Sequence, residues 1–209
     1  MSASPPKFIP PCRPTSGTRL PKGGAWLHEP KLDGYRLQIV KERVQVRLHS
    51  RGGHDWTRRM PCLAEALQGV PCSSAVLDGE LILHDRRGRP YFNGLSAAIA
   101  RDAPELTVYV FDLLHRDGAD LRPLPLKERR RELANLVGRA KIPCLHLVEA
   151  FDDGAALFRW CEVYELEGIV SKRRDSSYKS GECKAWRKVK TSAWREANRE
   201  RWRLFEGRG

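Results

Sequence analysis

The stretch Glu29-Pro30-Lys31-Leu32-Asp33-Gly34-Tyr35-Arg36 places a lysine, a carboxylate, a glycine and an arginine at the start of an expected strand. A lysine amine is a nucleophile only when unprotonated, and free lysine, with a pKa near ~10.4, is almost wholly charged at neutral pH. Burial and neighbouring cations disfavour the ammonium form, and Arg36 supplies one such cation. We therefore interpret Lys31 as a nucleophile, although Asp-Gly is also a common turn between strands.

Regular elements are expected on both sides of this stretch. Residues 35–40 and 44–48 alternate apolar and polar side chains across a turn at 41–43, which is typical of a half-buried antiparallel hairpin. Further strands are expected at 26–29, 75–83, 106–114, 144–148, 167–172 and 186–190, and helices at 60–67, 91–100, 126–137 and from Asp152 or Asp153 to about 165. This order predicts an α+β domain of antiparallel sheets flanked by helices.

Basic side chains recur at the ends of expected strands. Arg51 precedes Gly52 and Gly53, where backbone N–H groups are open to a phosphate and the arginine fork can donate two hydrogen bonds. Near the other end of the chain, alternation puts Lys188 and Lys190 on one face of a strand. Two like charges repel unless an anion lies between them, so this pair predicts a phosphate site.

Acidic and aromatic residues accompany these cations. Asp78 and Glu80 flank a glycine, and Glu167 precedes a strand that ends at Lys172. Phe111 belongs to a strand rich in valine and aromatics, where an aromatic ring can stack on a base. Each of these patterns taken alone is also typical of an ordinary turn or a core strand.

Charge and composition limit the class of protein. The 209 residues carry a net charge of +12, and residues 171–209 hold 13 Lys or Arg against five Asp or Glu. Such a balance favours a polyanionic partner, most plausibly nucleic acid. No apolar run reaches the roughly 20 residues that span a bilayer, and the six widely spaced cysteines form no Cys-x-x-Cys pair. We expect a cytoplasmic protein with reduced thiols, without zinc and away from membranes.

Six short motifs, taken in order, resemble those of ATP-dependent DNA ligases. The resemblance spans 29–190 and is closest to the ligase domain of bacterial end-joining ligases, and its motifs are Lys31-Leu32-Asp33-Gly34-Tyr35-Arg36, Ser50-Arg51-Gly52-Gly53, Asp78-Gly79-Glu80, Phe111-Asp112-Leu113-Leu114, Glu167-Gly168-Ile169-Val170-Ser171-Lys172 and Trp186-Arg187-Lys188-Val189-Lys190. It implies an ATP-grasp-like nucleotidyltransferase (adenylation) domain. It also implies that Lys31 takes AMP from ATP as a phosphoramidate and that AMP passes to a DNA 5′-phosphate for strand sealing in DNA repair.

The resemblance also implies roles for the other motif residues. Glu29 would lie beside adenine, Phe111 would stack on it and Glu80 would contact ribose. Arg36 and Arg51 would bind ribose or the nick phosphate, Lys188 and Lys190 would hold the AMP phosphate, and Lys172 would also contact nucleic acid. Glu167, with Asp78, would bind magnesium or manganese, and Asp33 would act near the reacting hydroxyls. Magnesium suits carboxylate and phosphate oxygens.

The chain departs from the family after Lys190. Such ligases normally continue into an OB-fold, whereas only 19 residues follow here. We expect an irregular proline- and glycine-rich arm at 1–24, an adenylation domain at 25–190 and a basic C-terminal helix at 191–209 with Ser192 as its N-cap. A partner protein that supplies the OB-fold or an end-binding function would then complete the enzyme on nicked or broken DNA, in association with the bacterial nucleoid.

Two other functional classes remain open. An RNA ligase or a capping-type nucleotidyltransferase shares the lysine motif, and competition between ATP and GTP at Lys31 distinguishes it. A non-catalytic nucleic-acid-binding remnant is the other class. It has no physical need to keep charged side chains that converge on one cavity, which is what Lys31, Glu80, Glu167, Lys188 and Lys190 are expected to do.

Overall fold

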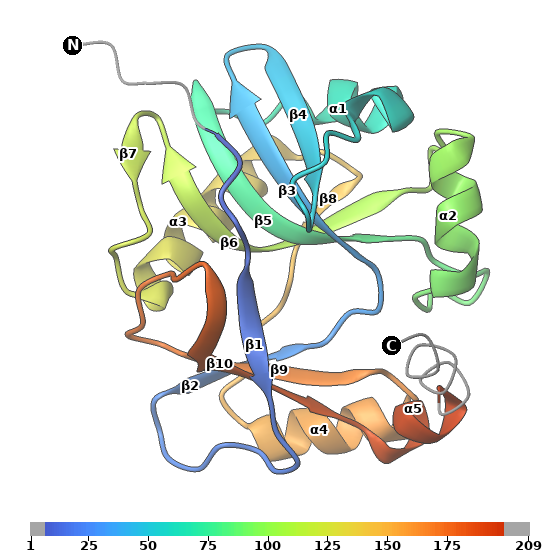
Figure 1. The fold of residues 1–209 in the computed structure, drawn as a ribbon, viewed down its shortest axis with the longest axis vertical. Coiled ribbons are helices and arrows are strands. Elements are labelled where there is room, and N and C mark those ends of the chain that lie inside the picture. Colours follow the sequence, from blue (N-terminus) through green and yellow to red (C-terminus); the bar gives the residue numbers. More distant parts are fainter. Residues whose placement is uncertain (1–6, 199–209) are drawn as a thin grey trace.

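The computed structural model describes residues 7–198 and contains two β-sheets with helices around them (Figure 1). Within that range, the smaller sheet has four strands in the order β1 (Cys12–Ser16), β10 (Gly181–Lys190), β9 (Gly168–Arg173) and β2 (Trp26–Pro30). β9 is antiparallel to both β10 and β2, whereas β1 runs parallel to β10. This sheet therefore carries the residues that lead into Lys31 and those that follow Glu167.

The larger sheet holds the hairpin predicted from the sequence. Its order in the described part of the chain is β4 (Gln45–Ser50), β3 (Tyr35–Glu42), β5 (Ser74–Ile82), β6 (Thr107–Arg116) and β7 (Ala119–Asp120), with β8 (Leu145–Leu147) parallel to β6. The middles of β3, β5 and β6 are buried almost continuously. Such runs arise when both faces of a sheet are covered.

Helices cover the outer faces of the two sheets. The larger sheet packs against α1 (Pro61–Leu67), α2 (Phe92–Ala100) and α3 (Leu126–Ala140), and a short 3-10 turn at Thr57–Arg59 precedes α1. The smaller sheet packs against α4 (Gly154–Val163), and α5 (Ser192–Ala197) follows β10 (Figure 1). Asp153 caps α4 by accepting a hydrogen bond from the Ala156 amide, as an N-cap aspartate does. The cap of α5 is Thr191 rather than the predicted Ser192.

A small apolar cluster joins the two sheets. Phe111 and Leu114 of β6 pack with Cys183 and Trp186 of β10, and Cys12 of β1 belongs to the same cluster. The cluster fixes how the sheets face one another, and a pocket opens beside it.

The N-terminal segment differs from the irregular arm expected at 1–24, because residues 12–16 form β1. Proline lacks the N–H that a central strand must donate, which is why a segment containing Pro14 reads as irregular. β1 is an edge strand with a register shift between Pro14 and Thr15, so the missing donor costs little.

No helix among the residues that the structure describes is long and apolar enough to cross a membrane.

Candidate active site

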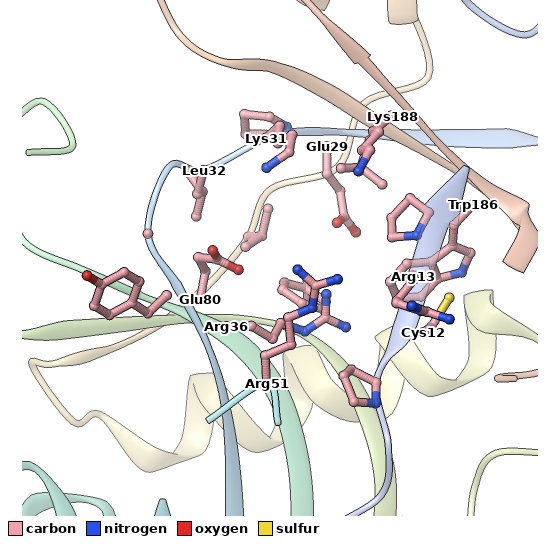
Figure 2. Close-up of a pocket in the computed structure, with 18 of the residues that line it drawn as sticks. Cys12, Arg13, Glu29, Lys31, Leu32, Arg36, Arg51, Glu80, Trp186 and Lys188 are labelled. Atoms are coloured by element: carbon pink, nitrogen blue, oxygen red, sulfur yellow. The ribbon is translucent and has the colours of Figure 1, made fainter. Parts of the chain in front are cut away.

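A pocket of about 510 Å³ lies between the two sheets. It is lined mainly by charged and aromatic side chains from both sheets and by the N-terminal strand β1. Figure 2 shows Lys31, Lys188 and Glu29 reaching into this space from one side and Arg36, Arg51 and Glu80 from another. Phe111 and Lys172 also line the pocket, so eight of the residues singled out in the sequence meet in one cavity.

Lys31 lies on the connection that leaves β2 for β3. Its backbone amide donates to the carbonyl of Gly168 at 2.8 Å, which ties this connection to the start of β9. Its Nζ atom donates to Glu167 Oε2 at 2.7 Å, and Lys190 Nζ lies 2.9 Å from the other oxygen, Oε1. The buried Glu167 carboxylate thus bridges two ammonium groups.

Lys188 lines the pocket two residues before Lys190 on β10. Burial lowers the pKa of Lys188, and the nearby charges of Lys31 and Lys190 lower it further. The ammonium of Lys190 also lies 3.6 Å from the centroid of the Trp194 ring. The anion expected near Lys188 and Lys190 is therefore already present in part, as the carboxylate of Glu167.

Arg36, a half-buried residue of the pocket wall, forms an ion pair with the buried Asp78. The guanidinium donates two hydrogen bonds of 2.6 Å to the Asp78 carboxylate, and the Tyr178 hydroxyl donates a third at 2.8 Å. Asp78 is 0 % exposed and is not among the residues that line the pocket. Both oxygens of Asp78 therefore accept hydrogen bonds from Arg36 or Tyr178 away from the pocket, which does not fit the metal ligand that the sequence predicted.

Glu29 and Lys172 form a buried pair, with Lys172 Nζ 2.6 Å from Glu29 Oε2. The same ammonium lies 4.3 Å from the centroid of the Phe111 ring and 4.1 Å from that of Trp186. Lys172 is 1 % exposed, and burial lowers its pKa although Glu29 favours the charged form. A side chain so enclosed cannot reach the phosphates of a duplex, so the predicted nucleic-acid contact does not fit Lys172.

The remaining predicted residues lie around the opening. Burial raises the pKa of Glu80 to about 7, although Lys31 and Arg36 favour its charged form. Arg51 is exposed and lines the pocket, which suits a contact with a phosphate that arrives from solvent. Asp33 is half-buried two residues after Lys31 and is not part of the lining.

Several contributors to the pocket were not singled out from the sequence. Cys12 and Arg13 of β1 form one wall, and Tyr35, Trp56 and Phe92 lie at another. Arg130 of α3 approaches from behind and holds the Glu29 carboxylate. The helical periodicity could have placed Arg130 on the buried side of α3. The residues on that face are 126, 129, 130, 133 and 136, and all of them are buried.

A metal site made by protein groups alone is not evident in residues 7–198, where no three His, Cys, Asp or Glu side chains are grouped to hold an ion. Magnesium, however, is commonly held by one or two carboxylates together with substrate phosphates. Glu167, beside Lys31, fits such a shared site.

A lysine held by a carboxylate, among further cations and between two sheets, defines a domain of the nucleotidyltransferase class. The family model described as the ATP dependent DNA ligase domain matches residues 14–190, and the chain belongs to this family.

Curated relatives agree with the family. The chain is 42% identical over 172 residues to the multifunctional non-homologous end joining protein LigD of Pseudomonas aeruginosa, covering 81% of this chain and 20% of that protein. It is 37% identical over 179 residues to a probable DNA ligase of a Mycobacterium species, covering 80% and 34% respectively. The chain thus spans about a fifth of the length of the first relative and about a third of that of the second.

Solved structures show the same fold. The ligase domain of LigD from M. tuberculosis superposes with a TM-score of 0.74 at 36% identity, covering 86% of this chain and 60% of that one. A mycobacterial DNA ligase D complexed with ATP and MES superposes with a TM-score of 0.72 at 33% identity, with 86% and 59% coverage. The α+β nucleotidyltransferase fold predicted from the sequence is confirmed.

Proposed function

We propose that this domain forms a covalent lysyl-AMP from ATP and transfers the AMP to a DNA 5′-phosphate, which a neighbouring 3′-hydroxyl then displaces to seal the strand. The observation that carries the proposal is the contact of Lys31 with Glu167 inside a pocket that Lys188 also lines. Lys172 also lines the pocket and shares a carboxylate with a second cation, but its ammonium is enclosed by Phe111 and Trp186 and its side chain is 2% exposed. The Lys31 side chain is 23% exposed and stays open to a substrate.

The first step is a displacement at the α-phosphorus of ATP. The Lys31 ammonium first loses one proton, and the free amine then forms the nitrogen–phosphorus bond while the bond from phosphorus to the pyrophosphate oxygen breaks. The nitrogen loses a second proton to give the phosphoramidate. Glu167 Oε2 holds Nζ in place and, as the carboxylate that accepts its hydrogen bond, is positioned to receive a proton from it. The lowered pKa of Lys188 is consistent with an ammonium that is stabilised when a phosphate enters beside it. Positioning and electrostatics supply most of the catalysis in such transfers.

The rest of the pocket suits the nucleotide and the DNA end. Glu29 and Phe111 lie together deep in the cavity, where a base fits, and Glu80 lies nearer to Lys31, where ribose hydroxyls fit. Arg36 and Arg51 reach into the pocket from the side that also carries Glu80 (Figure 2), where they suit sugar and phosphate oxygens. Asp33, half-buried two residues after Lys31, keeps the role near the reacting hydroxyls that the resemblance implies.

Magnesium or manganese would be held by Glu167 and the phosphates of the substrate. The ion would offset negative charge on the phosphorus during transfer. Glu167 contacts Lys31 through Oε2 and Lys190 through Oε1, so the carboxylate that would hold the ion is the one that positions Lys31.

Strand sealing in end joining is the setting that the relatives favour. The relative from Pseudomonas aeruginosa is described as a multifunctional end joining protein, and the net charge of +12 suits a DNA substrate. We place the activity in the cytoplasm, at the nucleoid, with other domains or a partner protein to hold the DNA.

The direct test is transfer of label from ATP to Lys31. The protein is incubated with magnesium and ATP labelled in the α-phosphate, then denatured and separated. We expect label on the wild type that survives denaturation and alkali and is lost in acid, as a phosphoramidate is. We expect none on Lys31→Ala. Lys184→Ala, which removes an exposed lysine of β10, is the matched control and should retain the label.

Two further results decide the class. Chasing the labelled protein with a nicked duplex that carries a 5′-phosphate should move the label to DNA, and excess unlabelled ATP should block labelling more effectively than GTP. Absence of label on the wild type, even with pyrophosphate removed, would contradict the proposal for this domain by itself. Preference for GTP or for an RNA end would favour the capping or RNA ligase class.

A further inference from the structure

Arg130 lies outside the pocket yet contacts three of the residues that form its deep end. Arg130 lies in the first half of α3. Its Nη1 atom donates to Glu29 Oε1 and, at 3.3 Å, to the carbonyl of Phe111. Its Nη2 atom donates to the carbonyl of Val148 at 2.7 Å. All three acceptors belong to residues that line the pocket, whereas Arg130 does not. One guanidinium therefore connects β2, β6 and the segment after β8 at one point.

The preceding residue, Arg129, has a different task on the same helix. It is 0 % exposed and donates two hydrogen bonds of 2.8 Å to Asp112, and it also donates to the carbonyls of Leu124 and Ser176. None of these acceptors lines the pocket. Of these two adjacent buried arginines, Arg129 therefore contacts only the core, whereas Arg130 contacts residues that line the pocket. Substitutions at the two positions can be compared directly, because both lie on the same helix.

The environment of Glu29 explains what Arg130 contributes. Glu29 is 2 % exposed, and each of its carboxylate oxygens faces one cation, Arg130 on Oε1 and Lys172 on Oε2. A buried carboxylate is costly unless it is paired, and a bidentate-capable guanidinium fixes orientation as well as charge. Each oxygen can still accept a further hydrogen bond. Arg130 therefore holds the Glu29 carboxylate in one orientation at the pocket wall, and the carboxylate can still accept a hydrogen bond from a ligand.

We propose that Arg130 is a positioning residue for base recognition, which holds the Glu29 carboxylate and the Phe111 backbone so that the pocket accepts a purine bearing an amino donor and rejects one bearing a carbonyl. The inference rests on the proposed function, in which this cavity takes ATP. Adenine presents an amino group at position 6 of the ring, whereas guanine presents a carbonyl oxygen there. A fixed carboxylate pairs with the first and leaves the second with two opposed acceptors, which is how a site discriminates strongly.

The test measures binding of ATP and of GTP by calorimetry without a divalent ion, so that no transfer occurs. Arg130→Gln should weaken ATP binding about tenfold or more, the scale expected when one partner of a buried charge pair is removed. The ratio of ATP to GTP affinity should fall with it. Arg130→Lys should recover part of the ratio, because it keeps the charge but not the fork. Arg131→Gln, which removes an exposed arginine of the same helix, is the control and should leave both affinities unchanged.

A double substitution separates positioning from general loss of structure. If Arg130 acts through Glu29, the ATP to GTP ratio of Glu29→Gln plus Arg130→Gln should equal that of Glu29→Gln alone, since the second change has nothing left to position. Arg129→Lys should lower the unfolding temperature while the ratio stays at the wild-type value. Near-ultraviolet circular dichroism on every variant identifies any that fail to fold, and Arg130→Lys then carries the comparison.

The outcomes separate this inference from the proposed function. An unchanged ATP to GTP ratio in a folded Arg130→Gln or Arg130→Lys protein overturns the inference, even if Lys31 becomes labelled. Independent, multiplicative effects in the double variant also overturn it. Conversely, ATP-selective binding that depends on Arg130 supports it even if the wild type never acquires label, in which case only the transfer chemistry has failed.

Discussion

Glu80 lies in β5 at the edge of the pocket, where burial raises the pKa of its carboxyl from an ordinary value of 4.5 to about 7. Between these two values the folded protein holds a proton that the unfolded chain has released. Stability from this group is therefore fully present below pH 4.5 and is lost as the pH rises through about 7. Near neutrality the site contains both the acid and the carboxylate.

We predict that Glu80→Gln abolishes the fall in stability that ionisation of Glu80 causes as the pH rises. At pH 8 the variant should be more stable than the wild type by an amount on the order of 2 kcal/mol, and the difference should shrink towards pH 4.5. Urea unfolding at several pH values measures it. Glu65→Gln, on the exposed face of α1, is the control. A parallel pH dependence in Glu80→Gln and the wild type would contradict the assignment.

The sequence predicted which residues belong to the pocket where the chemistry demands a particular group. It predicted less well which side chain each of them contacts, because that depends on the folded geometry. The motifs predicted that Lys31, Glu29 and Lys188 would line one pocket, and they do. They could not show that the Asp78 carboxylate accepts hydrogen bonds from Arg36 and Tyr178, because Tyr178 lies a hundred residues away in the sequence. Nor could they show that the ammonium of Lys172 is enclosed by two aromatic rings.

At the scale of the element, β9 depends on a glycine at its first residue. Gly168 has φ +145°, and a Cβ atom there would lie 2.1 Å from the Val189 carbonyl oxygen and 2.7 Å from Lys190 Cα, both in the backbone of β10. Its carbonyl also accepts the amide of Lys31. The close approach of two strands therefore sets both Glu167 and Lys31 in place.

We predict that Gly168→Ala destabilises the domain by about 3 kcal/mol or more, because strain and a backbone clash combine. Label on Lys31 should fall with it even in the folded fraction. The matched control is Gly138→Ala in α3, where a Cβ meets nothing within 4 Å. Alanine is the better helix former, so this variant should be equal or more stable by roughly 0.5 kcal/mol. Equal urea midpoints for Gly168→Ala and the wild type would contradict the argument.

Most elements were predictable because they show strong periodicity or apolar runs. The hairpin β3–β4 and the helices α3 and α4 lie within a few residues of their expected positions. The strand β1 was missed because Pro14 opposes a strand in isolation, and only its place at the sheet edge makes it acceptable. β7 has only two residues, which is too short for any pattern.

At the scale of the whole molecule, charge is the property that most directly bears on DNA. The net charge is +12, and exposed arginines such as Arg13 and Arg51 stand at the mouth of the pocket. Binding to DNA releases counterions from phosphates, so affinity should depend strongly on salt. The basic helix predicted for 191–209 lies partly outside the described residues, which include α5 only.

We predict that affinity for a nicked duplex falls about a thousandfold between 50 and 200 mM salt if roughly six phosphates are contacted. Fluorescence anisotropy over a salt series gives the slope. Arg51→Gln should reduce its magnitude by about one unit, whereas Arg139→Gln, at an exposed position of α3, should leave it unchanged. A slope near zero would exclude a binding mode dominated by phosphates.

The pairing of β1 with β10 bears on the order in which the molecule is assembled. Cys12 lies opposite Gly181, so one wall of the pocket joins segments that are synthesised far apart in time. Closing so long a loop is entropically costly, and contacts of this range tend to form late in folding. A nascent chain on the ribosome can complete the larger sheet before β10, the strand that pairs with β1, has been synthesised. The pocket between the two sheets is therefore finished only after β10 has emerged, and an incomplete chain lacks one of the walls that close it.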